Sequence, residues 1–160
     1  MFLSAQEGDT HAVAAWLDEG GGVDAGCAEH GGMTLLVAAA VGGQEAMVRM
    51  LLQRGASVNL QNILGITALM AAATKGHTTT VQALLDAKAD ASLQDSGAST
   101  ALMYAEHYKH TETAQLLRQH AKRPTAEAEA AVMHAAATSP TANLSGRRVR
   151  IFDLKPTPEP

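Results

Sequence analysis

The feature that most limits how this chain can fold is a short segment that returns at a fixed spacing. The segment GITAL at residues 65–69 has counterparts in GMTLL and ASTAL, whose threonines lie 33 residues before and after Thr67. A weaker copy covers residues 8–24, so the first helix of that unit must begin almost at Met1. A chain with this period is predicted to fold as a linear array of similar units. The columns that repeat in register are Ala39, Ala72 and Ala105; Gly43, Gly76 and Lys109; and Leu51, Leu84 and Leu117.

Each unit is predicted to be a pair of short helices. The hydroxyl of Thr67 can accept a hydrogen bond from a backbone N–H and so begin a helix, and Gly76 can adopt the left-handed conformation that ends it. A second helix then runs from near Thr78 to about Ala87, with an apolar stripe that only a neighbouring unit can cover. Because the chain has one Trp, two Tyr and two Phe, the core must be built from Ala, Leu, Val and Met, which favours an all-α body. The stripe consists of Val81, Leu84 and Leu85.

The repeated pattern resembles the ankyrin repeat. The resemblance covers about residues 2–121 and implies an all-α solenoid of about four helix-pair repeats with β-hairpin-like finger loops. Met70 and Met103 stand where that family usually has histidine, and Lys88 and Lys109 replace turn glycines. A left-handed lysine costs about 1 kcal/mol or more, so we expect a looser turn at Lys109. The repeats are placed at about 1–30, 31–63, 64–96 and 97–121.

Three polar stretches join the helix pairs, and we name them fingers 1, 2 and 3. Finger 1 spans residues 24–34, finger 2 spans 58–65 and finger 3 spans 91–98. Because Gly, Asn, Asp and Ser favour tight turns, each finger is predicted to project from the stack as a hairpin-like loop.

The composition changes after Ala121. Residues 122–138 are predicted to form a capping or linker helix. If the helix is a cap, its apolar stripe, which includes Val132, would cover the open end of the array. Residues 139–160 hold four of the five prolines and are predicted to be an extended or disordered tail. The alternation at 149–151 leaves open a short strand that adds to a sheet of another protein.

The composition argues against several classes of function. The net charge is −4 and no segment forms a broad basic face, so nucleic acid is not expected as a partner. No apolar run approaches the roughly 20 residues that cross a bilayer, and the start of the chain lacks a signal-peptide pattern. The single cysteine, Cys27, cannot close an internal disulfide. We therefore expect a monomer in the cytoplasm or nucleus that makes no membrane contact.

Histidines near the end of the array suggest a metal site. His107 and His110, with Glu106 and Glu112 nearby, have a spacing that could bring ligands together. However, His110 shares its column with His77, where ankyrin repeats normally carry a structural histidine, and a turn is expected between His107 and His110. We therefore expect no metal site and no cofactor.

A second cluster suggests a thiol nucleophile. Cys27 lies beside Glu29 and His30, but the three residues stand in a glycine-rich loop without rigid support. Because neither a nucleophile elbow nor a phosphate-binding glycine motif is present, the chain is not expected to be an enzyme.

The sequence is therefore predicted to be a non-catalytic protein–protein interaction module, an adaptor or scaffold. The alternative is the N-terminal interaction part of a larger multidomain protein whose effector domain follows Pro160. The resemblance implies that another protein binds the finger tips and the first helices of the pairs. Ile63 and Leu64 at the tip of finger 2 either contact that partner or are buried against the next finger. The predicted partner-binding residues are Met33, Val41, Ile63, Leu64, Ile66, Thr74, Lys75, Ser96, Ser99, His107 and Tyr108.

Overall fold

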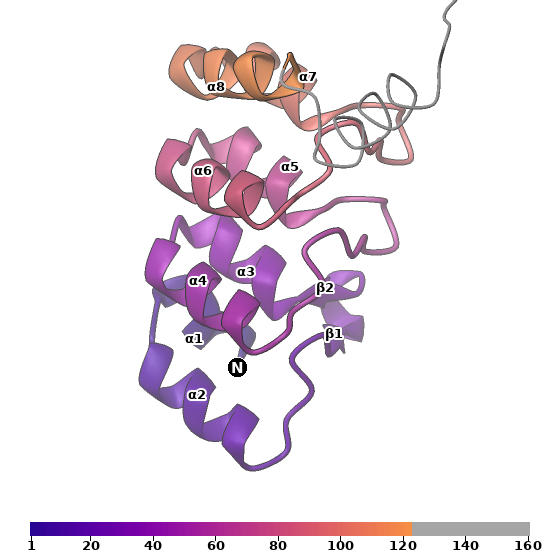
Figure 1. The fold of residues 1–160 in the computed structure, drawn as a ribbon. Helices are drawn as coiled ribbons and strands as arrows, with labels where there is room; N and C mark the ends of the chain where they lie inside the picture. Colours follow the sequence, from indigo (N-terminus) through magenta and orange to yellow (C-terminus); the bar gives the residue numbers. More distant parts are fainter. Residues whose placement is uncertain (123–160) are drawn as a thin grey trace, which may run out of the picture. The chain divides into compact units, whose positions relative to one another are not determined.

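The computed structural model describes residues 1–122 as a stack of helix pairs (Figure 1). The predicted helix at 122–138, apart from Lys122, and the predicted tail at 139–160 lie outside the described residues. Among residues 1–122, no helix has the length and apolar character needed to cross a membrane. The elements are α1 (Phe2–Glu7), α2 (Thr10–Asp18), β1 (Gly26–Cys27), the 3-10 helix η1 (Ala28–His30), β2 (Met33–Thr34), α3 (Leu35–Gly42), α4 (Glu45–Gln53), α5 (Ala68–Lys75), α6 (Thr78–Asp86), α7 (Ala101–His107) and α8 (Thr111–Ala121).

The repeated threonines begin the first helices of the last three pairs. The side-chain oxygen of Thr67 accepts a hydrogen bond from the backbone N–H of Met70 at 3.2 Å. Thr34 and Thr100 cap α3 and α7 in the same way. Since each cap satisfies an N–H that the helix cannot bond internally, the 33-residue period of the threonines sets the period of the helices. The predicted caps are confirmed.

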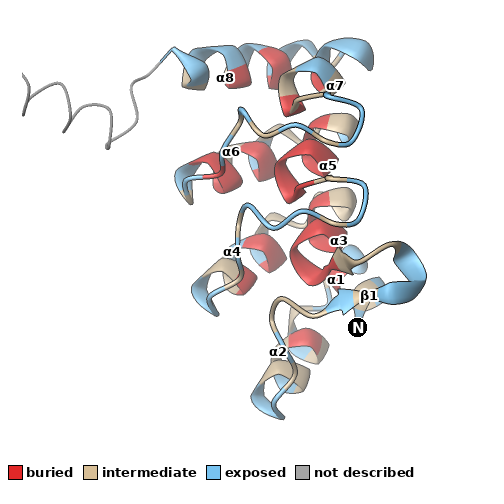
Figure 2. Ribbon diagram, turned by 90° about the vertical axis from the view of Figure 1, so that its right-hand side faces the viewer, coloured by how far each residue is buried: buried red, intermediate tan, exposed pale blue. Residues whose placement is uncertain are grey.

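The core lies between two rows of helices. The first helices α1, α3, α5 and α7 pack against one another in one row, and α2, α4, α6 and α8 follow one another in the second. Figure 2 shows the buried residues on the inner sides of both rows. Ala72 in α5 and Leu84 in α6 are completely buried, as are the equivalent residues of the preceding pair. The predicted all-α solenoid of helix pairs is confirmed.

A glycine and an imidazole interlock between successive pairs. Gly76, with φ 73°, ends α5, and the ring of His110 lies directly against it, because a Cβ on Gly76 would stand 2.5 Å from His110 Nδ1. His110 Nε2 is also 3.0 Å from the backbone oxygen of Thr74. Gly43 and His77 repeat this arrangement one pair earlier. These glycines therefore serve both as turn residues and as the surface on which the next pair rests.

The turn at Lys109 is not looser than the others, contrary to our expectation from the sequence. Lys109 adopts φ 63°, and the backbone N–H groups of Lys109 and His110 bond to Glu106 and Ala105 at 3.1 and 2.8 Å. The corresponding bonds at the Gly76 turn are 3.2 and 3.0 Å. The lysine therefore accepts the left-handed conformation, and the surrounding hydrogen bonds keep the turn closed.

The fingers differ in how they are closed. In finger 1, β1 and β2 pair antiparallel, with Gly26 opposite Thr34 and Cys27 opposite Met33. Fingers 2 and 3 have no assigned strand, and each is closed by two backbone hydrogen bonds, which join Asn62 to Gly65 and Ile66 in finger 2 and Asp95 to Ala98 and Ser99 in finger 3. The hairpin-like description therefore applies to all three, but only finger 1 has a strand pair.

Candidate functional site

The three fingers are joined to one another through the tip of finger 2. The N–H of Ile63 donates to the carbonyl oxygen of Gly31 in finger 1 at 3.0 Å. The carbonyl oxygen of Leu64 accepts from both the N–H and the hydroxyl of Ser96 in finger 3, each at 2.9 Å. The two central tip residues thus bond to opposite neighbours through their backbone, which fixes the tip on both sides.

Side chains at the base hold fingers 2 and 3 in shape. Asn62 Oδ1 accepts from the N–H groups of Leu64 and Ile66, both at 2.9 Å. Asp95, 33 residues later, accepts at its Oδ1 from Gly97 and Ser99, both at 2.8 Å. Such Asx turns replace backbone pairing with a side-chain bond. These side-chain hydrogen bonds are a second constraint on the conformation of the finger tips.

Ile63 and Leu64 point away from the core although their backbone is fixed. Their side chains are 76% and 59% exposed, so the alternative in which the tip buries them against the next finger does not describe this structure. The Ile63 side chain lies along Gly31, but this contact covers little of it. Two adjacent exposed aliphatic residues on a rigid loop form an apolar patch of the kind found at binding surfaces.

The other predicted partner-binding residues lie on the fingers, just after them, on the first helices α3, α5 and α7, or at the C-cap of α7. They share this placement but differ in exposure. The exposed members are Ile63, Leu64, Lys75, Ser96, His107 and Tyr108, and the half-buried members are Met33, Val41, Ile66, Thr74 and Ser99.

Sequence reasoning missed a depression beside α7. It has a volume of about 350 Å³ and is lined by three predicted residues, Ser99, His107 and Tyr108, together with Met103 and Tyr104. The rings of His107 and Tyr108 meet edge to face at a centroid distance of 4.8 Å. Nothing in the residue pattern distinguishes Met103 from the equivalent Met70, yet Met70 is buried and Met103 is 50% exposed.

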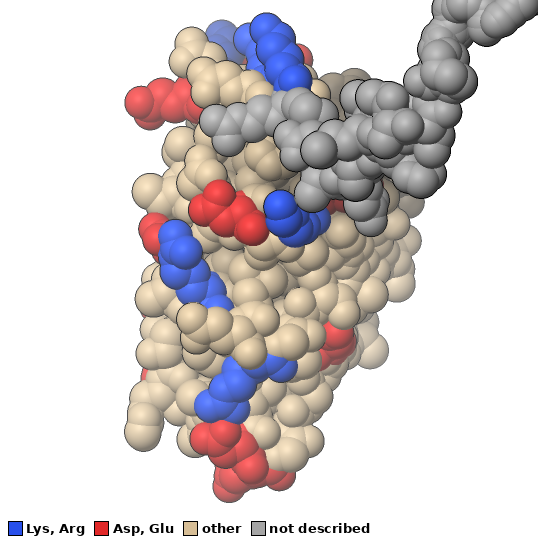
Figure 3. Space-filling model, viewed as in Figure 1, with Lys and Arg blue, Asp and Glu red and all other residues tan. Residues whose placement is uncertain are grey.

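Few charged side chains lie on this side of the array. Among the predicted partner-binding residues only Lys75 carries a full charge at neutral pH. In Figure 3, most of the visible Lys, Arg, Asp and Glu side chains lie over the second helices. Two of the charged contacts on the second helices are the exposed ion pairs Arg49–Glu45 and Arg54–Asp18, which stabilise little. The candidate surface is therefore largely neutral and partly apolar.

One charged group at the edge of this surface is held by a tyrosine. The hydroxyl of Tyr104 donates to Asp95 Oδ2. This hydrogen bond is the main cause of a lowered pKa of the Asp95 carboxyl. It also raises the pKa of Tyr104 to about 12, with a smaller contribution from burial. The pair therefore fastens finger 3 to α7.

The pKa of Tyr104 gives a direct test of this contact. In a Tyr108→Phe variant, Tyr104 is the one remaining tyrosine, and tyrosinate absorbance should report a pKa of about 12 against an ordinary value of 10.0. Since the folded pKa is the higher one, the stabilisation is present below pH 10 and is lost as the pH approaches 12. Adding Asp95→Asn should move the pKa back toward 10, with circular dichroism as the control for folding. An unchanged pKa after that substitution would contradict the contact.

The histidines weighed as metal ligands do not converge. His110 is turned into the stack, where it contacts Gly76 and Thr74, while His107 is exposed on α7. Within the part of the chain that the structure describes, no group of three or more His, Cys, Asp or Glu side chains could hold a metal ion.

The thiol cluster of finger 1 is partly assembled. Cys27 Sγ lies 3.1 Å from His30 Nδ1, so the structure brings these two side chains together. Over residues 1–122 no third side chain forms a hydrogen bond that orients His30, as a catalytic base would require. The contact supports no chemical step.

The fold and the surface together define the class of the protein, a helix-pair solenoid that displays loops and first helices along one side. A family model described as ankyrin repeats (3 copies) matches residues 1–95 and 69–143. The chain belongs to the ankyrin repeat family. No curated protein matches the chain. Ankyrin repeats are in general protein–protein interaction modules and typically not enzymes.

Proposed function

We propose that this protein is a non-catalytic adaptor or scaffold that binds another protein through its fingers and the adjoining first helices. The observation that carries the proposal is the pair Ile63 and Leu64, exposed on a loop whose backbone is bonded to both neighbouring fingers. Preorganised apolar side chains lose little entropy on binding and are typical of interaction hot spots. We further propose that the protein acts inside the cell, in the cytoplasm or nucleus, as a monomer.

The chemistry of the surface narrows the type of partner segment. Ile63, Leu64 and the half-buried Met33 and Ile66 offer aliphatic contacts, and Lys75 is the single charged member of the predicted set. A highly charged segment would lose hydration on such a surface without finding opposite charges. We therefore propose a partner segment that presents aliphatic or aromatic side chains to finger 2.

Replacing both tip residues should abolish most of the binding. Partners are first identified by proximity labelling in the native cell, and the affinity of a purified partner is then measured by calorimetry. The double variant Ile63→Asp, Leu64→Asp is expected to bind at least about tenfold more weakly, because two charges replace the apolar contacts. The unfolding midpoint should stay close to that of the native chain, since both side chains are exposed.

Leu3→Asp is the matched control for this experiment. Leu3 is 67% exposed in α1, a helix that carries none of the predicted partner-binding residues, so the substitution makes the same chemical change on an exposed leucine outside the predicted set. It should leave the affinity unchanged. Equal affinities of the double variant and the native chain would remove finger 2 from the proposal.

The proposal of a longer protein is tested separately. A full-length transcript that continues past Pro160 with a further domain would support it, and the array would then be the interaction part of that protein. A transcript that stops there would leave the adaptor proposal alone.

A further inference from the structure

Two polar contacts join the first helix pair to the second where α2 and α4 end. The carboxylate of Asp24, at the start of finger 1, accepts from the N–H of Ser57 at 2.8 Å and from its hydroxyl at 2.5 Å. Asp18, the last residue of α2, accepts from Arg54 at 2.5 Å. Because the Asp18–Arg54 pair is exposed and such pairs stabilise little, the doubly bonded Asp24–Ser57 contact is the stronger of the two.

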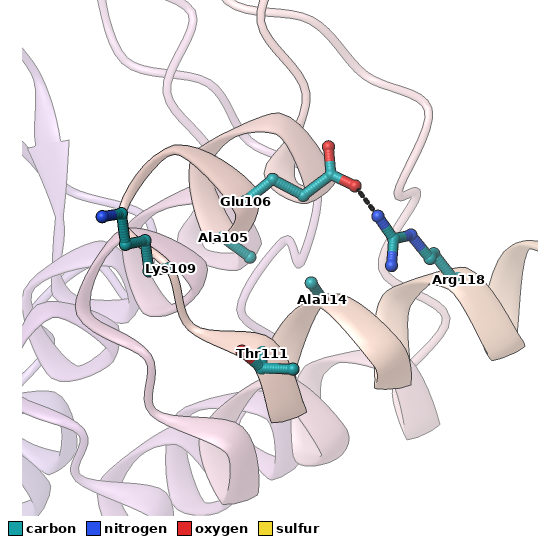
Figure 4. Close-up of a pocket in the computed structure, with 6 residues that line it drawn as sticks. All are labelled: Ala105, Glu106, Lys109, Thr111, Ala114 and Arg118. Atoms are coloured by element: carbon teal, nitrogen blue, oxygen red, sulfur yellow. Dashed lines mark hydrogen bonds and ion pairs between the residues drawn. The ribbon is translucent and has the colours of Figure 1, made fainter.

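These contacts differ from the other ion pairs in what they connect. Within residues 1–122, the other ion pairs stay inside one helix pair: Arg118 bonds to Glu106 across α8 and α7 (Figure 4), and the remaining one lies within α4. The Asp18–Arg54 pair and the Ser57 contact instead cross from one helix pair to the next. A change of charge at this junction therefore acts between repeats.

α2 has little apolar burial to hold it in place without these contacts. Val13 is the one buried residue of α2, whereas α4 buries Met47, Val48 and Leu51. Burial of apolar surface between neighbours is the main source of stability in a stack. The polar contacts at the end of α2 therefore make up a larger share of its attachment.

The position of Ser57 carries a negative charge in two other repeats. Asp24, Ser57 and Asp90 follow one another at intervals of 33 residues. The N–H of Asp90 donates to Asn59 Oδ1 of the preceding repeat at 2.8 Å, so a carboxylate at this position meets a neutral amide there. Ser57 instead meets the carboxylate of Asp24. The contact between the first two pairs thus requires residue 57 to be uncharged.

Ser57 is also accessible to an enzyme that modifies hydroxyl groups. It is exposed, within the stretch 54–67 that contains no helix or strand, and Arg54 precedes it by three positions. A basic residue near the target hydroxyl is a charge pattern that kinases use to select substrates. Within residues 1–122 the other hydroxyl with Lys or Arg at this distance is that of Thr78, which is half-buried in α6 and bonded to Thr113.

We propose that Ser57 is a phosphorylation site whose modification loosens α2 and the start of finger 1 from α4. The kinase transfers the γ-phosphoryl group of a nucleoside triphosphate to Ser57 Oγ, its catalytic base takes the hydroxyl proton, and the nucleoside diphosphate leaves. The phosphate removes the donated hydrogen bond and sets about 1.5–2 negative charges against the Asp24 carboxylate. It also competes with Asp18 for Arg54, since guanidinium groups bind phosphate strongly.

The modification also has a consequence for recognition. Finger 1 begins at Asp24, so a loosened start of this finger would change its share of the proposed binding surface. This consequence rests on the proposed function, whereas the phosphorylation of Ser57 and the loosening of α2 do not. The two tests therefore use no binding partner, and their failure would leave the proposed function standing.

The first test asks whether Ser57 is modified in the folded chain. The full-length protein is incubated below its unfolding temperature with ATP and an arginine-directed serine kinase, and the modified residue is mapped by fragment mass spectrometry. Mapping is needed because Thr125, outside the described residues, also follows a lysine by three positions. Ser57 should be phosphorylated, and Arg54→Ala should lower the initial rate at Ser57 at least about tenfold.

Arg49→Ala is the matched control, because Arg49 is also an exposed arginine of an ion pair near the end of α4. It lies outside the spacing that the kinase reads, so the rate at Ser57 should stay unchanged. A folded chain without phosphate on Ser57, or equal rates in the Arg54 and Arg49 variants, would overturn the proposal.

The second test measures the loosening of α2 by amide hydrogen exchange. In the phosphorylated chain, residues 10–18 of α2 should exchange at least about threefold faster than in the unmodified chain, while residues 68–75 of α5 keep their rate. Asp24→Asn removes the opposing charge and offers an amide that can donate to the phosphate, so phosphorylation should accelerate exchange much less in that variant. Unchanged exchange in α2, or equal acceleration with Asp24 and with the asparagine, would overturn the proposal.

Discussion

Replacing Leu84 with alanine is expected to lower the free energy of unfolding by about 2–5 kcal/mol, because the substitution leaves a cavity between helix pairs. Leu84 is completely buried in α6, and Leu51 and Leu117 hold the same position in α4 and α8. The loss affects contacts within the pair and with both neighbours, and stacking is the main source of stability in such an array. Chemical denaturation monitored by circular dichroism measures it.

Leu60→Ala provides the comparison for Leu84. Leu60 lies in finger 2 and is 38% exposed, so its loss should cost less than about 1 kcal/mol. A cost below about 0.5 kcal/mol at Leu84 would be typical of a surface position and would contradict its place in the shared core.

Gly76→Ala is expected to lower the free energy of unfolding by about 2–4 kcal/mol, of which about 1–2 comes from the left-handed backbone and the rest from overpacking against His110. The added Cβ would stand 2.5 Å from the imidazole. The same denaturation experiment measures this cost. Lys109→Ala is the matched control, since it keeps a Cβ in the same backbone conformation, and it should change the stability by less than about 0.5 kcal/mol.

A double-mutant cycle separates the two causes. In a His110→Ala background the imidazole is gone, so Gly76→Ala should cost only the backbone part, about 1–2 kcal/mol. Identical costs in both backgrounds would show that the imidazole does not press on this glycine.

Most of the fold follows from the period of the sequence. The threonine column predicts where the first helices begin, the glycine column predicts where they end, and α6 begins at Thr78 as expected and ends at Asp86, one residue earlier than expected. These features depend on contacts within a few residues, which a single sequence displays directly. The Lys109 turn was predicted wrongly because its closure depends on hydrogen bonds that override the local preference.

Less of the candidate surface could be predicted from the sequence. Whether Ile63 and Leu64 are exposed depends on where the neighbouring fingers lie, and the pattern of residues left both outcomes open. The Tyr104–Asp95 hydrogen bond joins a helix to a finger through side-chain geometry that no spacing rule encodes. Met103 is 50% exposed although the identical residue one repeat earlier, Met70, is buried, and the repeated pattern contains no sign of this difference.

The hydrogen bonds at the tip of finger 2 also limit how far the loop could change its conformation when a partner approaches. Ile63 bonds to one neighbour through its N–H and Leu64 bonds to the other through its carbonyl oxygen. A protein that had to displace this tip would break both connections at once, so remodelling would be resisted by three repeats together. A protein whose contour already matches the resting loops meets no such resistance. The proposed binding surface would therefore select a partner that fits the existing shape of the loops, without a change in their conformation.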